Sequence, residues 1–393
     1  MDSVRSGSLF GQILSIVDRK RFEGLVQEHK TDRGAKGLRS WDQMVAMLFC
    51  HMAQARSLRE ISTGLLCCEG KLKHLGMAKA PARSTLSYAN GHRSWKLYEA
   101  LFYELFGQCR QAAPGHRFQF KNKLLSLDAT IIELCASAFD WAKFRSGKGA
   151  VKLHVLLDHD GYLPCFAHIT EGAQHELKVA QTLELPKGAI VAMDRGYNDY
   201  HLFEKWTRQG VYFVTRLKDN AAYFSMEKLS SSETGFIRQD ELIEFEVFTA
   251  GRKIKETYRR VEIWVEEKQQ SMVLLTNHLK LSPLTIAAIY KERWQIELFF
   301  KTLKQNLRLK TFVGTSANAV HIQIWTALIA LLLTQFLKLK SSFGWSLSNL
   351  VALLRWNLFT YRNLWKWIDA PFDTPPLESE SNQLTFVLDS TPP

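Results

Sequence analysis

Apolar and polar residues follow different periods in successive parts of the chain. Residues 1–117 have the period of helices, and "SLREISTGLLCC" opens with a capping box, Ser57 and Glu60, before its apolar residues. The stretch that follows predicts a break at Asn90-Gly91 and then a helix over 95–106. The first third of the chain is therefore expected to be an all-helical unit.

After residue 117 the pattern changes to short apolar runs. "LLSLDATIIEL" (124–134) is rich in residues suited to a buried strand, and 151–170 contains two apolar runs about Asp160-Gly161, which is typical of a hairpin. "GAIVAMDRGYND" predicts a strand that ends at Asp194, and "VYFVTRLK" predicts another after a helix. This order indicates an α/β unit, a mixed sheet with helices on its faces.

The rest of the chain predicts a β-rich region, a helical region and a tail. Residues 236–276 alternate between apolar and polar, as strands of an inserted β-rich subdomain would. The chain is expected to be helical from 282 to 340, and its most apolar run, 322–336, is shorter than the ~20 residues that span a membrane, so it predicts a buried core helix. The tail is rich in proline and serine and is expected to be poorly packed.

The net charge of the chain indicates what kind of partner it binds. The 393 residues carry a formal net charge of +12, with a pI near 9.3. Residues 1–117 hold 18 Lys and Arg against 10 Asp and Glu, a net of +8. An acidic partner is expected, and nucleic acid is the commonest one. A membrane surface is the competing explanation, but the sequence offers no long amphipathic basic helix and no signal peptide.

The six cysteines add little chemistry. None forms a CxxC pair, and Cys67 and Cys68 are adjacent, so neither a zinc site nor a disulfide framework is indicated. We expect a reduced protein of the cytoplasm.

Three carboxylates stand out because of where they lie. Asp128 interrupts an apolar strand, and Asp194 ends another. Glu297 lies on the polar edge of the late helix. A desolvated carboxylate is costly without a partner. Each acid alone is better explained by a salt bridge or a capped turn. Together, if the strands are neighbours, they predict a site for Mg²⁺ or Mn²⁺, with two ions serving phosphoryl transfer.

The helix that carries Glu297 has a second feature. In "YKERWQIELFFKTLKQ" a rotation of ~100° per residue puts Tyr290, Arg293, Glu297 and Lys304 on one stripe ~60° wide. A salt-bridged surface is the common explanation for such a stripe. The converging acids favour a functional one.

These residues carry a resemblance to a known family. The spacing Tyr290-x2-Arg293-x3-Glu297-x6-Lys304 resembles the Y-R-E-K signature of bacterial transposases of the insertion-sequence-4 family. "LDATII" around Asp128 and "AMDRGYND" around Asp194 resemble that family's two catalytic aspartate motifs. The likeness covers roughly residues 5–340 and includes the helical module before the catalytic domain.

The resemblance implies a DNA transposase with a ribonuclease-H-like catalytic core, in which Asp128, Asp194 and Glu297 hold the divalent ions. It also implies that Tyr290, Arg293 and Lys304 contact DNA, and the basic residues of "FVTRLK", Arg216 and Lys218, match positions near the same DNA end. Mg²⁺ is the implied cofactor, as two ions, with Mn²⁺ as a substitute. The implied partners are the terminal inverted repeats and the target DNA, bound by a homodimer in the cytoplasm at the bacterial nucleoid, with no membrane.

The expected organisation has three parts. Residues 1–117 form a basic, helical DNA-binding domain. Residues 118–340 form the ribonuclease-H-like catalytic domain, with the β-rich insertion at about 221–280. Residues 341–393 form a C-terminal helical segment and a flexible tail.

Other features are weaker candidates. Asp158, His159 and Asp160 resemble a metal cluster but sit at the hairpin tip, where Asp-Gly is turn chemistry. The His175-Glu176 pair could approach the site, and Asp199 is expected to cap a helix. Lys152 is a further candidate for DNA contact.

Two rival functions and one departure from the family remain. Met272 occupies the place where the resembled family carries a tryptophan that steadies a flipped base, so a DNA hairpin intermediate is in question. A metal-dependent nuclease of the same fold would cut without joining strands. A catalytically silent regulator derived from a transposase would only bind DNA.

Overall fold

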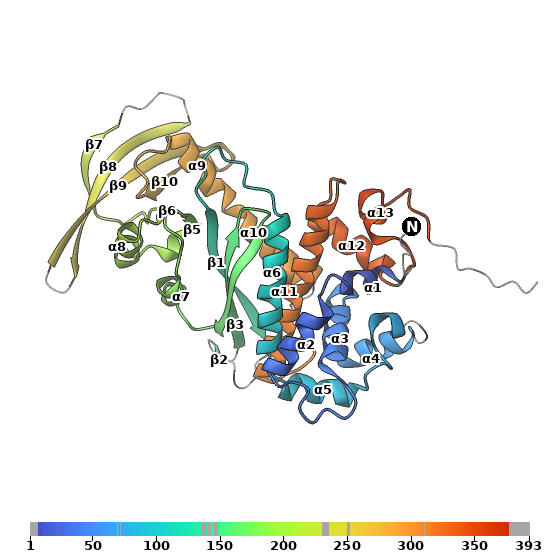
Figure 1. Cartoon of the computed structure of the whole chain (residues 1–393). Coiled ribbons are helices and arrows are strands. Elements are labelled where there is room, and N and C mark those ends of the chain that lie inside the picture. The colour runs from blue at the N-terminus through green and yellow to red at the C-terminus, as the bar shows by residue number, and fades with distance from the viewer. Residues whose placement is uncertain are drawn as a thin grey trace, which may run out of the picture.

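The computed structural model describes residues 7–376 except 69, 71, 136–138, 140, 142, 145–147, 230–235, 250–251, 308 and 310–311. The expected tail from 377 onward lies outside these residues. In Figure 1 the strands gather on one side and the N-terminal and C-terminal helices on the other, with the long helix α11 between them.

The N-terminal part is helical, as predicted. Its elements are α1 (Leu9–Leu14), α2 (Arg19–Glu28), α3 (Ser40–Met52), α4 (Leu58–Leu66), the 3₁₀ turn η1 (Lys73–Leu75), α5 (Arg83–His92) and α6 (Lys96–Ala112). The Ser57 hydroxyl accepts from the Glu60 N–H and caps α4, as predicted. The Glu60 carboxylate accepts from the N–H of Arg56, one residue before the cap, where a capping box would have the Ser57 N–H.

One local prediction in this part is wrong. The helix α5 continues through Asn90-Gly91 and ends at His92. The reason is tertiary, because Asn90 is 1% exposed and its side-chain oxygen accepts from Gln43 Nε2 at 2.8 Å. A buried hydrogen bond with α3 outweighs the turn preference of the Asn-Gly pair.

Within the described residues the strands form one ten-stranded sheet in the order β2-β3-β1-β5-β6-β10-β9-β8-β7, with β4 also paired to β3. The strands are β1 (Leu124–Leu134), β2 (Lys143–Phe144), β3 (Lys148–Asp158), β4 (Leu163–Glu171), β5 (Ile190–Met193), β6 (Tyr212–Arg216), β7 (Phe224–Lys228), β8 (Ile237–Thr249), β9 (Arg252–Val265) and β10 (Gln270–Thr276). β1, β5 and β6 are parallel, whereas β3 and β4 are antiparallel to their neighbours. This is the mixed sheet flanked by helices that the sequence predicts.

Alternate residues of the central strand explain how the sheet is covered on both faces. Val191 and Met193 pack with α8 (Tyr200–Arg208), near α7 (Glu176–Thr182). Ile190 and Ala192 pack on the other face with α9 (Pro283–Glu292). A strand buried on both faces is apolar at every position, and β5 is.

The β-rich insertion is attached to the same sheet. β10 pairs with β6, and β9, β8 and β7 follow outward from it, at the upper left of Figure 1. The strands predicted over 236–276 are present, but they extend the main sheet and do not fold back on themselves as a separate one. Two buried ion pairs, Arg259 with Asp240 and Arg260 with Glu241, link β9 to β8.

The late helical region is interrupted where the sequence predicts continuity. It consists of α9, α10 (Trp294–Lys301), the π-helical turn η4 (Thr302–Asn306) and α11 (Ala317–Lys340). A turn at Arg293 separates α9 from α10, and the described residues between Asn306 and Ala317 are not helical. The predicted stripe therefore does not lie on one regular helix.

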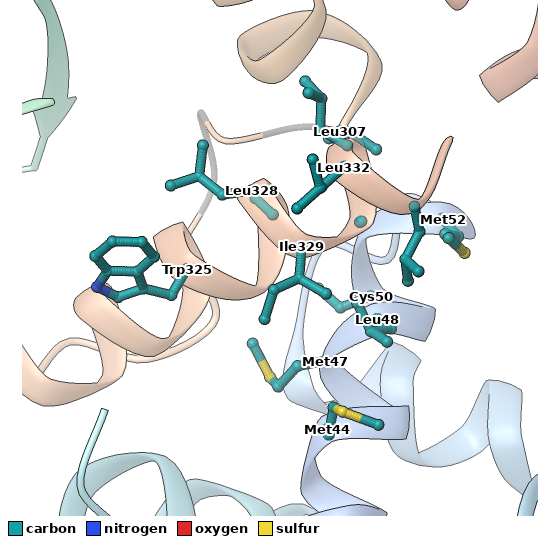
Figure 2. Packing of buried hydrophobic residues seen from close by; sticks show 14 of the residues in the cluster. Met44, Met47, Leu48, Cys50, Met52, Leu307, Trp325, Leu328, Ile329 and Leu332 are labelled. Carbon is teal, nitrogen blue, oxygen red and sulfur yellow. The ribbon is translucent and has the colours of Figure 1, made fainter. Parts of the chain in front are cut away.

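The core helix α11 joins the two halves of the molecule. It is long and apolar enough to cross a membrane, but 89% of its most apolar window is buried inside the protein, as the sequence predicts for a core helix. Figure 2 shows side chains of α3 packed toward α11, with Met47 facing Ile329. The N-terminal helices and the part that contains the sheet thus share one hydrophobic core, and the predicted domain boundary at 117 remains a prediction.

The described chain ends in α12 (Leu347–Asn357) and α13 (Leu364–Asp369). The backbone N–H groups of Leu9 and Phe10 donate to the carbonyls of Thr360 and Leu358, so the first helix is held against this C-terminal segment.

Candidate active site

Sheet register brings two of the predicted acids together. Leu127 on β1 pairs with Met193 on the parallel strand β5. Asp128 and Asp194 are the next residues along these two segments, so they lie side by side, with the strands ~4.8 Å apart. β1 continues past Asp128, which also pairs with Val155 on β3. Asp194 lies where β5 ends, and its Oδ1 accepts from the Gly196 N–H at 2.7 Å.

The surroundings of Asp128 change its acidity. Burial is the main cause that raises the pKa of Asp128 from 3.8 to about 7, and the negative charges of Asp194 and Glu176 act in the same direction. The Ala129 N–H and the Arg293 guanidinium act in the opposite direction. The Arg293 charge therefore offsets the cost of burying the Asp128 carboxylate only in part.

The third acid is connected to the first through an arginine. Arg293 Nη2 donates to Glu297 Oε1 at 2.7 Å, and Arg293 Nη1 lies 3.8 Å from Asp128 Oδ2. The buried residues Ile296 and Phe300 fix α10 in the core, which keeps Glu297 on the side that faces β1. Arg293 thus bridges Asp128 and Glu297.

The remaining residues of the stripe lie on both sides of this bridge. The Arg293 guanidinium carbon is 5.5 Å from the centre of the Tyr290 ring. Burial raises the pKa of Tyr290, and the nearby charges of Arg293, Asp194 and Arg216 also act on it. Lys304, on η4, donates from Nζ to the carbonyl of Ile131 on β1 at 2.8 Å. Tyr290 and Lys304 therefore lie on opposite sides of the acids.

Two basic residues of β6 and its loop complete the predicted set. Arg216 Nη2 lies 3.7 Å from Asp219 Oδ1, and Lys218 Nζ donates to the Asn198 carbonyl at 3.3 Å. Asn198 follows the turn that holds Asp194, so both residues border the acids.

Several weaker candidates have ordinary structural roles. Lys123 forms ion pairs with Asp158 and Asp160, which explains that acidic hairpin tip without a metal. Asp199 accepts from the Leu202 N–H and caps α8, as expected. Lys152 is 8% exposed and lies 3.3 Å from Glu176, so it is not available to DNA on the surface.

Sequence patterns did not identify two residues that matter here. Glu292 is only 4% exposed, accepts from the Tyr162 hydroxyl at 2.8 Å and forms an ion pair with Arg117. It anchors the end of α9 just before Arg293. Tyr197 follows Asp194 closely, and its buried hydroxyl has no hydrogen-bond partner within the described chain. The only local signal for Glu292 was its place beside the stripe.

A divalent cation would need a change in these contacts. Among the described residues, no three His, Cys, Asp or Glu side chains are grouped closely enough to hold a metal ion. Arg293 lies between two of the acids instead, because it donates to Glu297 and lies 3.8 Å from Asp128. Carboxylate oxygens are the donors that Mg²⁺ prefers, and the charges around Asp128 favour a cation. The donor set fits a hard divalent ion once Arg293 turns to another anion.

Family models match most of the chain. Residues 119–333 match the transposase DDE domain, and residues 5–78 match a domain of unknown function (DUF4372). The first match covers the sheet, the insertion, the three acids and most of α11.

Curated relatives agree with this match. The chain is 30% identical over 254 residues to a Sinorhizobium fredii protein named as the transposase y4zB, covering 64% of this chain and 70% of the relative. It is 28% identical to a Geobacillus stearothermophilus protein named as a transposase for insertion sequence element IS5377, covering 65% and 67%. A Synechocystis relative, named for element IS4SA, is 27% identical and covers 66% and 73%.

A solved structure is also similar. The piggyBac transposase synaptic complex with hairpin DNA aligns with 93% of this chain and 81% of its own, at 10% identity and a TM-score of 0.40. This likeness is weak.

Proposed function

The chain belongs to the transposase DDE domain family, and we propose that Asp128, Asp194 and Glu297 are its three catalytic acids. It is a DNA transposase of an insertion sequence, an enzyme that cuts and transfers DNA strands. The observation that supports the assignment most directly is the register of β1 and β5, because it sets Asp128 beside Asp194 within the matched domain.

The finer family is also a proposal. Tyr290, Arg293, Glu297 and Lys304 have the Y-R-E-K spacing of the insertion-sequence-4 family. We propose this branch because the two ends of that spacing border the acids, with Lys304 held against β1 and Tyr290 near Asp194.

Divalent cations serve this family. We propose Mg²⁺ as the ion, with Mn²⁺ as a substitute and two ions per site. Bound by the three acids, they would activate the attacking oxygen and stabilise the leaving oxygen of a phosphodiester. The chain's own part is positional, because β1 and β5 fix two acids rigidly and α10 supplies the third from a helix anchored in the core.

The basic residues around the acids would hold the DNA backbone. Arg293 and Lys304 would bind phosphates near the cleaved bond, and Tyr290 would donate to another. Arg216 and Lys218 would contact the same DNA end from the other side of Asp194. Phosphates and acids then compete for Arg293, so DNA binding would free Asp128 and Glu297 for the metal.

The wider assembly follows from the same reaction. The N-terminal domain, residues 1–117, would bind the terminal inverted repeats, and the catalytic domain, 118–340, would act on them and on target DNA. Residues 341–393 would form the C-terminal segment. Two transposon ends must be paired, so we propose a homodimer on DNA, in the cytoplasm at the nucleoid.

Met272 leaves the route of cleavage open between a hairpin and two separate cuts. Met272 on β10 pairs with Ile263, and Trp264 pairs with Ser271. Trp264 lies against Arg238, whose guanidinium carbon is 4.9 Å from its ring. We propose that the hairpin step is weak or absent, because methionine stacks on a base less well than tryptophan does.

The catalytic assignment has a direct test. Asp128→Ala, Asp194→Ala and Glu297→Ala should each abolish Mg²⁺-dependent cleavage of transposon-end DNA while binding of that DNA persists. Near-normal cleavage by any of the three variants would remove that acid from the site.

The rival functions are separated by a strand-transfer assay with pre-cleaved ends. A transposase joins these ends to target DNA. Nicking without joining would favour the nuclease. Binding with neither reaction, in Mg²⁺ and in Mn²⁺, would favour the silent regulator.

A further inference from the structure

A basic hollow of about 440 Å³ lies where α4 and α5 begin. It is lined by Arg56, Arg59 and Arg83, together with Phe312 and Val313 from the loop before α11. All three arginines are exposed. The N-terminal ends of both helices, with the residue just before the cap of α4, therefore present three positive side chains to one concave surface.

These arginines lack partners within the protein. In the part of the chain that the structure describes, the side chains of Arg56, Arg59 and Arg83 make no hydrogen bond and no ion pair. The nearby acid, Glu60, accepts from the backbone N–H of Arg56 instead. Three unpaired guanidinium groups around one hollow repel each other, which favours an anion between them.

A second basic hollow of about 590 Å³ lies along the same helix. Its lining includes Lys30, Arg33 and Lys36 from the loop after α2, and Tyr88 and His92 from α5. Tyr88 is 67% exposed and stacks on His92 with ring centres 4.0 Å apart. The α5 surface thus has cations at both sides and a rigid aromatic ring between them.

The helix between these hollows is held firmly from beneath. Leu86 is fully buried, and Asn318 on α11 donates to the carbonyls of Asn90 and Arg93. The outer face carries Ser84, Thr85 and Ser87, all exposed, and α5 contains no acidic residue. Short hydroxyl side chains and arginines on a rigid helix are the groups that contact DNA phosphates.

One loop connects the first hollow to the chain segment that carries Lys304. Trp141, just after β1, donates to the carbonyl of Thr315, and Phe139 contacts Phe312 at 6.1 Å between ring centres. The loop that holds Phe312 and Thr315 follows η4, which carries Lys304. In Figure 1, α5 and β2 lie at the same lower end of the molecule. DNA that passes Lys304 at the end of β1 would therefore meet the first hollow next.

From these contacts we propose that α5, with Arg56, Arg59 and Arg83 on one side and the loop after α2 on the other, binds the phosphate backbone of duplex DNA. The inference rests on the proposed function, since it takes DNA as the substrate. It goes further because it assigns the duplex DNA beside the cleavage point to the outer face of α5. The contact is to phosphates and is independent of base sequence.

The test is salt-dependent binding of the full-length protein to a labelled duplex of ~30 bp with random sequence, followed by fluorescence anisotropy. The triple variant Arg56→Ala, Arg59→Ala, Arg83→Ala should weaken binding at least about tenfold and flatten the slope of log Kd against log salt by about 2 to 3. A matched control, Lys187→Ala, Lys268→Ala, Lys366→Ala, removes three exposed charges elsewhere and should change both quantities little. Tyr88→Ala should weaken binding with no change in the slope.

The outcomes are distinguishable. Unchanged binding by the triple variant, or an equal loss in the lysine control, overturns the inference, as does tighter binding of single-stranded RNA of the same length than of the duplex. If the triple variant unfolds, Arg83→Gln alone should still reduce the slope by about 1, and an unchanged slope counts against the site. If the wild-type protein binds through these arginines but neither cuts nor joins DNA, the proposed function fails and the binding face stands.

Discussion

At the scale of single residues, Arg293 decides the state of the candidate site. Its guanidinium touches Glu297 and lies near Asp128, while its Nε is buried without a partner in the described part of the chain. The residue therefore stabilises the acids in the absence of other cations. The same contact keeps them from sharing a metal ion.

We predict that Arg293→Ala lowers the free energy of unfolding of the metal-free protein by about 1–3 kcal/mol, because it leaves two acids unpaired. Added Mg²⁺ or Ca²⁺ should then raise the melting temperature of the variant more than that of the wild type. Thermal unfolding without DNA, with and without the ion, measures both.

Arg208→Ala is the matched control, because this exposed arginine pairs with Glu204 on α8, away from the acids. Its loss should change stability by less than about 1 kcal/mol. Equal metal stabilisation of wild type and Arg293→Ala would contradict the role given to Arg293.

At the scale of elements, the junction of α9 and α10 positions that arginine. The helix breaks at Arg293, and the residue before it is fixed by contacts to two distant segments. Glu292 accepts from Tyr162, beside the β3–β4 turn, and pairs with Arg117, before β1. The buried carboxylate therefore ties the late helix to the sheet that holds Asp128.

We predict that Tyr162→Phe costs about 1–2 kcal/mol of unfolding free energy, because Glu292 loses a hydrogen bond while buried. Cleavage should fall as well, because Arg293 and Glu297 lose their fixed position. Urea unfolding and an end-cleavage assay measure the two effects.

Glu292→Gln separates charge from hydrogen bonding, since glutamine can still accept from Tyr162. It should retain more activity than Glu292→Ala. If all three variants cleave DNA as well as the wild type, the junction has only a structural role.

At the scale of the whole molecule, α11 and α3 join the N-terminal helices to the catalytic part. His51 on α3 is 1% exposed, and its Nδ1 lies 3.1 Å from the carbonyl of Leu307, to which it donates. Its Nε2 lies 3.0 Å from the hydroxyl of Thr326 on α11. A neutral histidine thus links three segments across the shared core.

Burial lowers the pKa of His51 from 6.5 to about 4. Between pH 6.5 and about 4, His51 therefore binds a proton in the unfolded chain but not in the folded chain. The free energy of unfolding is therefore unaffected by His51 above pH 6.5. It falls as the pH drops toward 4, by about 3 kcal/mol in all. His154, His159 and His321 are shifted in the same direction and add to the fall.

We predict that His51→Gln makes the unfolding free energy less dependent on pH between 6.5 and 4, because one of the titrating groups is gone. Urea unfolding at pH 7 and pH 5 compares the two proteins. An identical pH dependence would show that His51 is protonated in the folded state or does not titrate.

The sequence by itself determined the kinds of element and most of their order, because these depend on the local spacing of apolar residues. It placed Asp128 within a strand, Asp194 at the end of another and Glu297 on a helix, and the motifs around them pointed to the family. It also identified α11 as a core helix from its length and composition.

Only the tertiary structure decided the contacts between distant segments. The parallel register of β1 and β5 set the two aspartates together, and the turn at Arg293 put a guanidinium between Asp128 and Glu297. Gln43 kept Asn90-Gly91 helical against its local preference, and Tyr162 buried Glu292. Each depends on residues far apart in the chain, whose meeting is fixed by packing and by the cost of burying an unpaired polar group.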